Sequence, residues 1–151
     1  MSTANIRPMI PSDISELVTM IHELAAFHGD TATASIASVT RDTAGPHPWW
    51  HVFVAHDDTT LIGYLVVLPK SKVADGERGI DLDHMYVRAP HRGTGIGRAF
   101  IAVAKTHATA HACTYLTIGT TPHNTAAQTA WEVCGFTRLP NSGSPRFRMN
   151  I

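Results

Sequence analysis

The residues best suited to bind a ligand lie between positions 81 and 98, which read as a strand, a turn and the start of a helix. Three closely spaced glycines occupy the turn, at Gly93, Gly95 and Gly97. Glycines leave backbone N–H groups unshielded, and the positive end of the helix dipole adds to their attraction for anions. Arg92 and Arg98 flank the turn and can form charge-assisted contacts with phosphate oxygens. The stretch therefore predicts a site for a phosphate-bearing cofactor.

The glycine spacing excludes two common phosphate-binding loops. A dinucleotide fingerprint that starts at Gly93 would need a third glycine where Arg98 stands, and the Gly-Lys-Ser/Thr of a Walker loop is absent. What remains is Arg92-x-x-Gly95-x-Gly97 directly after an apolar strand that ends at Val87. Here the chain resembles the GNAT superfamily of acetyl-coenzyme A-dependent N-acetyltransferases, whose signature is Arg/Gln-x-x-Gly-x-Gly/Ala.

The resemblance extends to both sides of this motif. Downstream, Asn124-x-x-Ala127-x-x-Ala130-Trp131-x-x-x-Gly135-Phe136 is similar to a second GNAT segment, an Asn followed by a short helix and a Gly-Phe pair. Upstream, Ile6-Arg7-Pro8 and the run at 47–55 are most similar to the diamine (spermidine/spermine) N-acetyltransferase branch.

The resemblance implies an enzyme that transfers an acetyl group from acetyl-coenzyme A to a primary amine of a small molecule by direct attack, and a homodimer. It also implies that the pantetheine arm pairs with exposed backbone groups of the central strand, as an added strand would. The expected cofactor-binding residues are Met85, Tyr86, Val87, Arg92, Gly93, Thr94, Gly95, Ile96, Gly97, Arg98 and Asn124. A helix N-cap is an equally natural role for Asn124.

Asp83 and His84 are the candidate catalytic residues, because they stand where the resembling branch has two carboxylates. A free aspartate has a pKa of about 3.9 and a free histidine about 6.5, so histidine is the better base near neutral pH. We expect Asp83 to bind a cationic amine and His84 to act as a base, often through water. Consecutive strand residues point to opposite faces, so only one should face the site unless a bulge intervenes. A structural role for either is the equal alternative.

The expected general acid is missing. Many relatives have a tyrosine seven residues after the Asn, and Trp131 occupies that position here. An indole N–H donates a hydrogen bond but is no acid of suitable strength, and we expect Trp131 in the core. Either the thiolate leaves without an acid, or Tyr86, Tyr115 or water supplies the proton. A cofactor-binding sensor that has lost catalysis is therefore a second hypothesis, and acetylation of a protein N-terminus or lysine is a third.

Composition narrows the class of protein. At 151 residues and 44% hydrophobic, the chain predicts one domain over residues 1–151. No apolar run approaches the roughly 20 residues that a membrane helix needs, so no membrane association and a cytoplasmic location are expected. Residues 1–83 carry 11 of the 12 acidic side chains, whereas Arg88, Arg92 and Arg98 lie in an interval without carboxylates, which favours an anionic ligand there. The basic residues form no dense cluster with aromatics, which argues against nucleic acid.

The histidines do not predict a metal site. His107 and His111 are four apart on an expected helix, but no third ligand is evident.

The hydrophobic pattern predicts the elements that position these residues. A capping pattern at Asp13 and Glu16 opens the clearest helix, which should end near residue 28. Trp49 and Trp50 are expected to be buried in the core, with exposure at a dimer interface as the alternative. The other predicted elements are strands at 6–10, 49–56, 61–68, 80–87, 114–119, 136–139 and 146–150, a polar loop at 70–79, and helices within 30–48, from the glycines to about 111, and at 124–134. This order predicts an α/β (α+β) fold, a GNAT-like mixed, mostly antiparallel central sheet with splayed central strands and helices on both faces.

Overall fold

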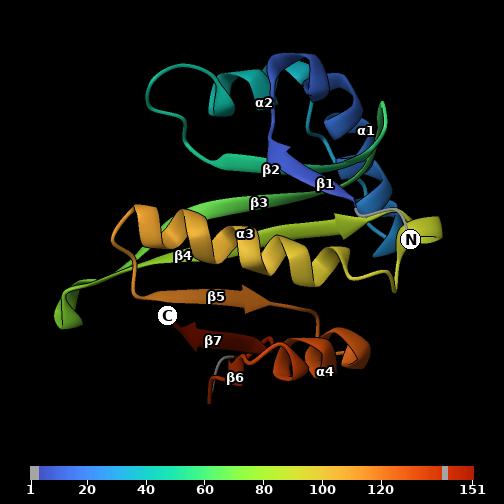
Figure 1. Ribbon diagram of the computed structural model, residues 1–151. Helices are drawn as coiled ribbons and strands as arrows, with labels where there is room; N and C mark the ends of the chain where they lie inside the picture. Colours follow the sequence, from blue (N-terminus) through green and yellow to red (C-terminus); the bar gives the residue numbers. More distant parts are fainter. Residues whose placement is uncertain (1–3, 141–142) are drawn as a thin grey trace. The chain divides into compact units, whose positions relative to one another are not determined.

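The computed structural model describes residues 4–140 and 143–151, and Figure 1 shows their strands and helices. The strands are β1 (Asn5–Pro8), β2 (His51–Asp57), β3 (Thr60–Lys72), β4 (Glu77–Val87), β5 (Tyr115–Gly119), β6 (Thr137–Arg138) and β7 (Arg146–Asn150). The α-helices are α1 (Ile14–Phe27), α2 (Ile36–Thr43), α3 (Ile96–Ala110) and α4 (Thr125–Val133). Three single-turn 3-10 helices are η1 (Pro11–Asp13), η2 (Val73–Asp75) and η3 (Ala89–His91).

The strands are hydrogen-bonded in the order β1-β2-β3-β4-β5-β7-β6. β1 and β2, β5 and β7, and β6 and β7 pair antiparallel, whereas β4 and β5 pair parallel, so the predicted mixed, mostly antiparallel sheet is confirmed. The β4–β5 ladder runs from Gly79 to Leu82 on β4, and β4 then continues to Val87. The last part of β4 thus extends past its pairing with β5, as the expectation of splayed strands requires.

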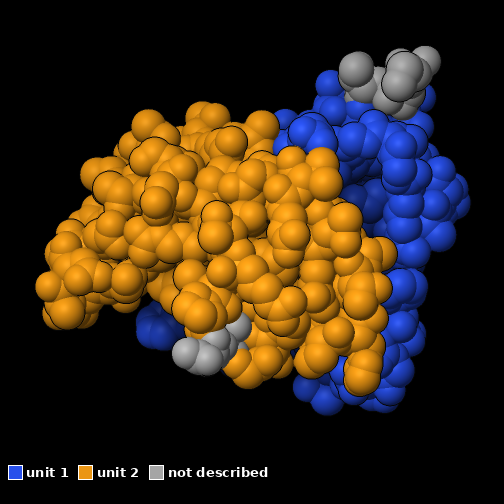
Figure 2. Space-filling view, turned by 90° about the horizontal axis from the view of Figure 1, so that it is seen from below, with its two compact units in different colours: residues 1–66, 84–100 blue, residues 67–83, 101–151 orange. Residues whose placement is uncertain are grey.

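The chain divides into two compact units, which Figure 2 shows in different colours. The first unit comprises residues 1–66 and 84–100, and the second comprises residues 67–83 and 101–151. The boundary in β4 falls between Asp83 and His84.

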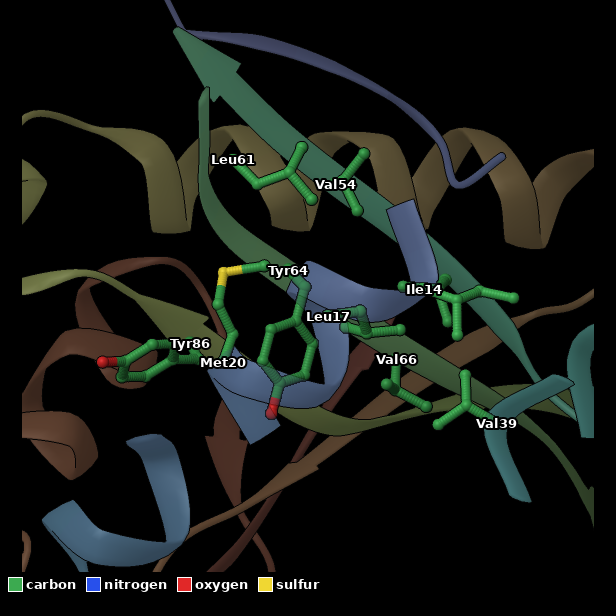
Figure 3. Packing of buried hydrophobic residues seen from close by; sticks show 10 residues of the cluster. Ile14, Leu17, Met20, Val39, Val54, Leu61, Tyr64, Val66 and Tyr86 are labelled. Carbon is green, nitrogen blue, oxygen red and sulfur yellow. The ribbon is translucent and has the colours of Figure 1, made fainter. Parts of the chain in front are cut away.

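The core of the first unit is formed by α1 against β2, β3 and β4. Leu17 and Met20 of α1 and Tyr64 of β3 are fully buried, and Tyr86 of β4 is 9% exposed (Figure 3). Burying one side chain of the size of leucine contributes roughly 1.5–3 kcal/mol.

The beginning of α1 differs from the predicted capping pattern. The chain is already helical from Pro11, in η1, and the Asp13 carboxylate reaches back to accept a hydrogen bond from the Ile10 amide at 2.9 Å. It also accepts two hydrogen bonds from the Arg7 guanidinium, at 2.7 and 3.1 Å, which lower the pKa of Asp13. Asp13 thus caps η1, and its side chain makes no capping bond to α1. The expected Asp13–Glu16 box was wrong because the helical start lies one turn earlier.

In the second unit, Tyr115 lies across Gly79. A Cβ at Gly79 would come within 2.4 to 2.6 Å of the Tyr115 ring, so the close approach of β4 requires a glycine. The Arg148 guanidinium covers the ring at 4.3 Å from its centroid and binds the Glu77 carboxylate at 2.9 Å. The Tyr115 hydroxyl is buried and has no hydrogen-bond partner within the described residues. Burial raises the pKa of this phenol.

Two sequence predictions about the loops were wrong. The predicted polar loop at 70–79 is mostly strand, because Gly76 takes the left-handed conformation at φ 65° and reverses the chain within one short turn between β3 and β4. Trp49 is 78% exposed, whereas Trp50 packs against the core of the first unit. Both tryptophan amides bond the Asp42 carbonyl, which ties this loop to the end of α2 and leaves the Trp49 ring outside.

Candidate functional site

The glycine loop has the strand–turn–helix arrangement that the sequence predicted. β4 ends at Val87, η3 follows, and α3 begins at Ile96. Gly93 and Gly95 have φ values of 74° and 90°, which L side chains rarely adopt. A Cβ placed on either glycine would meet no atom of the described residues within 4 Å, so they leave this side of the loop open. The first N–H groups of a helix lack intrahelical partners, and those of α3 begin here, so the loop can accept an anion such as a pyrophosphate.

Neighbouring side chains fix the shape of this loop. Ile96 is 5% exposed and anchors the start of α3. The Thr94 hydroxyl donates to the His91 carbonyl at 2.6 Å. Gly97 faces Met85, whose sulfur would lie 3.7 Å from a Cβ at that position. Contacts of the loop's own side chains therefore fix its conformation, while Gly93 and Gly95 remain accessible.

Arg92 lies beside the loop in a defined position. Its Nε donates to the Val87 carbonyl at 2.7 Å, and its guanidinium carbon lies 4.9 Å from the centroid of the Phe27 ring. Phe27 is the last residue of α1, and it is 62% exposed. Because Nε is used by the Val87 carbonyl, the two Nη groups of Arg92 are the ones suited to contact phosphate. Arg98 is exposed on the first turn of α3.

Arg88 does not add its charge to the loop, although it lies in the interval that the sequence shows without carboxylates. Its guanidinium binds Glu16 and Glu23 of α1 and donates from Nη1 to the Leu61 carbonyl at 2.8 Å. Tyr86 donates from its hydroxyl to Glu23 at 2.9 Å. The carboxylates come from α1, more than 60 residues away in the chain, so the sequence around Arg88 could not predict these ion pairs.

The Arg88 ion pairs predict a measurable contribution to stability. Arg88→Met leaves Glu23 with the Tyr86 hydroxyl as its remaining partner, so we expect the free energy of unfolding to fall by about 2–3 kcal/mol. Urea unfolding followed by circular dichroism would measure the loss. Arg41→Met is the matched control, because it removes the ion pair of the exposed Arg41 side chain with its neighbour Asp42 and should leave the midpoint unchanged. Equal midpoints for both variants would contradict the structural role of Arg88.

The same ion pairs predict the response to acid. The hydrogen bond from Arg88 lowers the pKa of Glu23 below its ordinary value of 4.5. A lowered folded-state pKa means that the stabilisation is complete above the unfolded value and is lost as the pH falls through the folded value. Stability of the wild type should thus decline more steeply below pH 4.5 than that of Arg88→Met.

Both candidate catalytic residues reach the surface. Asp83 and His84 are both exposed, so neither side chain is buried by the alternation of strand residues between the two faces of the sheet. The Asp83 carboxylate makes no side-chain hydrogen bond or ion pair to any residue that the structure describes. His84 has its Nδ1 3.4 Å from the Tyr64 hydroxyl, with the two ring centroids 6.4 Å apart. Tyr64 was not among the predicted site residues, because it lies within an apolar strand and so has the sequence pattern of a core residue.

The two tyrosines considered as replacements for the general acid are poorly placed to donate a proton. The Tyr86 proton is directed at Glu23, and burial together with that hydrogen bond raises the pKa of Tyr86. The Tyr115 hydroxyl is buried beside Gly79 in the second unit. Trp131 is half-buried, and its indole N–H is buried without a hydrogen-bond partner within residues 4–140 and 143–151. Neither phenol is poised as an acid.

Asn124 caps α4, as the alternative interpretation predicted. Its side-chain Oδ1 accepts a hydrogen bond from the Ala127 amide at 3.1 Å, and the adjacent Gln128 amide bonds the Asn124 carbonyl. Its role toward a cofactor stays a prediction.

Other features of the described residues are less suited to catalysis. A polar cavity of about 540 Å³ lies in the first unit between η1 and the β2–β3 turn, and none of the predicted site residues lines it. No three His, Cys, Asp or Glu side chains in the described part of the chain are grouped as ligands of one metal ion. Over the same residues, none of the helices combines the length and apolar character needed to cross a membrane.

Comparison with known proteins places this fold and motif in one family. The sequence profile of the acetyltransferase (GNAT) family matches residues 18–136, which is most of the chain. The GNAT domain of S. lividans PAT is 16% identical and has a TM-score of 0.81, with 99% of this chain and 92% of that one covered. An acetyltransferase from Thermus thermophilus is 22% identical, with a TM-score of 0.74 and coverage of 99% and 98%.

A NatC complex bound to Gag peptide and coenzyme A contains a chain of the same fold. It is 15% identical, with a TM-score of 0.73 and coverage of 99% of this chain and 98% of that chain. These identities show the fold alone, whereas the profile match extends over both motifs and over β4, which contributes residues to both units. The chain therefore belongs to the acetyltransferase (GNAT) family, whose fold supports acyl-coenzyme A-dependent acetyl transfer.

Proposed function

We propose that this protein transfers an acetyl group from acetyl-coenzyme A to a primary amine of a small molecule, with a cationic amine as the preferred acceptor. The observation that carries the proposal is the open glycine loop at the start of α3. Gly93 and Gly95 hold backbone conformations with positive φ there, and no atom of residues 4–140 and 143–151 fills the space beside them. Such a loop suits the pyrophosphate of coenzyme A. The bound thioester supplies the activated acyl group.

The end of β4 is suited to hold the rest of the coenzyme. Its ladder with β5 ends at Leu82, so the backbone groups of Met85, Tyr86 and Val87 are the ones we assign to the pantetheine amides. A backbone N–H near Val87 would stabilise the acetyl oxygen as it gains negative charge. Arg92 is positioned by the Val87 carbonyl to bind phosphate through its Nη groups.

We assign the acceptor amine to Asp83 and His84. The exposed Asp83 carboxylate attracts an ammonium group, which must first lose one proton to solvent to become a neutral amine. The His84 imidazole takes the second proton as the amine nitrogen bonds to the acetyl carbon. The carbon–sulfur bond breaks in the same reaction, and the thiolate takes a proton from water. Water is favoured over Tyr86 because the Tyr86 hydroxyl already donates to Glu23.

A second candidate is a coenzyme-binding sensor without catalytic activity, favoured by the tryptophan at the usual position of the acid. The N–H of Trp131, which is unpartnered within the described residues, can donate a hydrogen bond and cannot transfer a proton. Peptide amines are the third candidate, and the NatC neighbour was solved with a peptide. The diamine branch, a homodimer, a single catalytic domain over 1–151 and a cytoplasmic location stay predictions from the resemblance and the composition.

The deciding experiment measures release of free thiol from acetyl-coenzyme A with a panel of acceptors. The panel contains diamines and polyamines, neutral amino-acid amides, and peptides with a free N-terminus or a lysine. Turnover that is highest with the small cations supports the proposal. Calorimetric binding of acetyl-coenzyme A without turnover on any acceptor would favour the sensor, and turnover confined to peptides would favour protein acetylation.

A further inference from the structure

His84 and Tyr64 form a pair whose two members have opposite environments. Tyr64 of β3 is fully buried, whereas His84 of β4 is exposed, and the Tyr64 hydroxyl lies 3.4 Å from His84 Nδ1. The imidazole therefore presents Nδ1 to the interior and its other nitrogen, Nε2, is the one left for a substrate. Such bonds are often long in the absence of substrate.

The packing around Tyr64 keeps its hydroxyl in place. Its ring lies in the core of the first unit with Leu17 and Met20 of α1, both fully buried (Figure 3). The Tyr86 ring follows on the adjacent strand at 6.1 Å between centroids, and its hydroxyl is bound to Glu23. A buried ring between these neighbours cannot change its rotamer without disturbing the core.

This geometry bears on the base because a neutral imidazole carries a single N–H. The nitrogen that holds the proton is set by the partner of the ring, and only the other nitrogen has a lone pair that can accept a proton. A hydroxyl both donates and accepts, so the direction of the Tyr64–His84 bond decides which nitrogen of His84 can act as base.

We propose that Tyr64 is a positioning residue for the reaction: its hydroxyl holds Nδ1 of His84 on the core side and leaves Nε2 facing outward. Because the proposed base takes the amine proton at Nε2, Nδ1 carries the ring proton and the Tyr64 hydroxyl accepts it. The inference rests on the proposed function for the role of His84 and names the group that orients it. Tyr64 acts through His84 and touches neither substrate nor coenzyme.

The test reads the tautomer of His84 directly. Long-range ¹⁵N–¹H spectra of ¹⁵N-histidine-labelled protein distinguish a protonated from an unprotonated ring nitrogen, and the His84 signals are assigned by their loss in His84→Gln. We expect Nδ1–H to be the main tautomer in the wild type and the Nε2–H tautomer to increase in Tyr64→Phe. Tyr115→Phe is the matched control, because it also removes one buried hydroxyl but lies in the second unit, and it should leave the His84 signals unchanged.

The outcomes separate this inference from the proposed function. An Nε2–H tautomer in the wild type would overturn the inference even if Tyr64→Phe does not fold, and so would identical spectra of wild type and a folded Tyr64→Phe. With an accepted amine, kcat of Tyr64→Phe should fall on the order of tenfold while KM for acetyl-coenzyme A stays constant. Absence of transfer by the wild type would overturn the proposed function. The spectra test the tautomer separately, because they are recorded without coenzyme.

Discussion

Replacing Gly95 with valine should lower the affinity for coenzyme A by at least about 100-fold, which corresponds to about 2.7 kcal/mol. Gly95 has a φ of 90°, where a β-branched residue is strained, and the open space beside it is the space that we assign to the pyrophosphate. Valine would either fill that space or turn the backbone N–H groups away from the phosphates. Isothermal titration calorimetry with coenzyme A measures the change.

A matched control separates backbone strain from the loss of the loop. Gly45 lies in the connection between α2 and β2, has a φ of 85°, and a Cβ added to it would likewise meet no atom within 4 Å. Gly45→Val should therefore carry a similar conformational cost and keep the affinity for coenzyme A. Wild-type affinity in Gly95→Val would refute the assignment of the glycine loop to the pyrophosphate.

Substitutions at Asp83 and His84 should change different kinetic parameters. His84→Gln removes the base, so kcat should fall by about 100-fold or more while KM for acetyl-coenzyme A is retained. Asp83→Asn removes the charge that attracts the ammonium group, so KM for the amine should rise with a smaller change in kcat. Steady-state assays with the best acceptor of the amine panel measure both parameters.

The control for these two variants is His47→Ala, an exposed histidine in the loop before β2, which should retain full activity. An unchanged kcat in His84→Gln would exclude His84 as the base. A rise of KM for the amine in both variants, without loss of kcat, would instead assign both residues to binding.

The parts of this fold that could be predicted from the sequence are those set by local chemistry. The glycine loop was predictable because the positive φ values of Gly93 and Gly95 and the start of a helix leave a pattern within a few residues. The end of α1 was predictable for the same reason, since Gly29 takes a φ of 76° just after Phe27.

The parts that could not be predicted depend on contacts between distant segments. Glu16 and Glu23 bind Arg88, so counting charges along the chain did not reveal that this arginine is already paired. Tyr64 pairs with His84 across two strands, and only the pairing of β3 with β4 brings them together. Asp13 illustrates the same limit at short range, because its partner Arg7 comes from β1 and not from the helix that it precedes.

The ion pairs of Arg88 have an evolutionary consequence. Glu16, Glu23, Tyr86 and Arg88 share one set of hydrogen bonds, so a neutral residue at position 88 would leave two acidic side chains of α1 without the cation that both now bind. Descendants of this chain can lose the arginine at little cost only if the glutamates change with it. These four positions should therefore vary together among orthologues, even though they belong to a helix and a strand far apart in the gene.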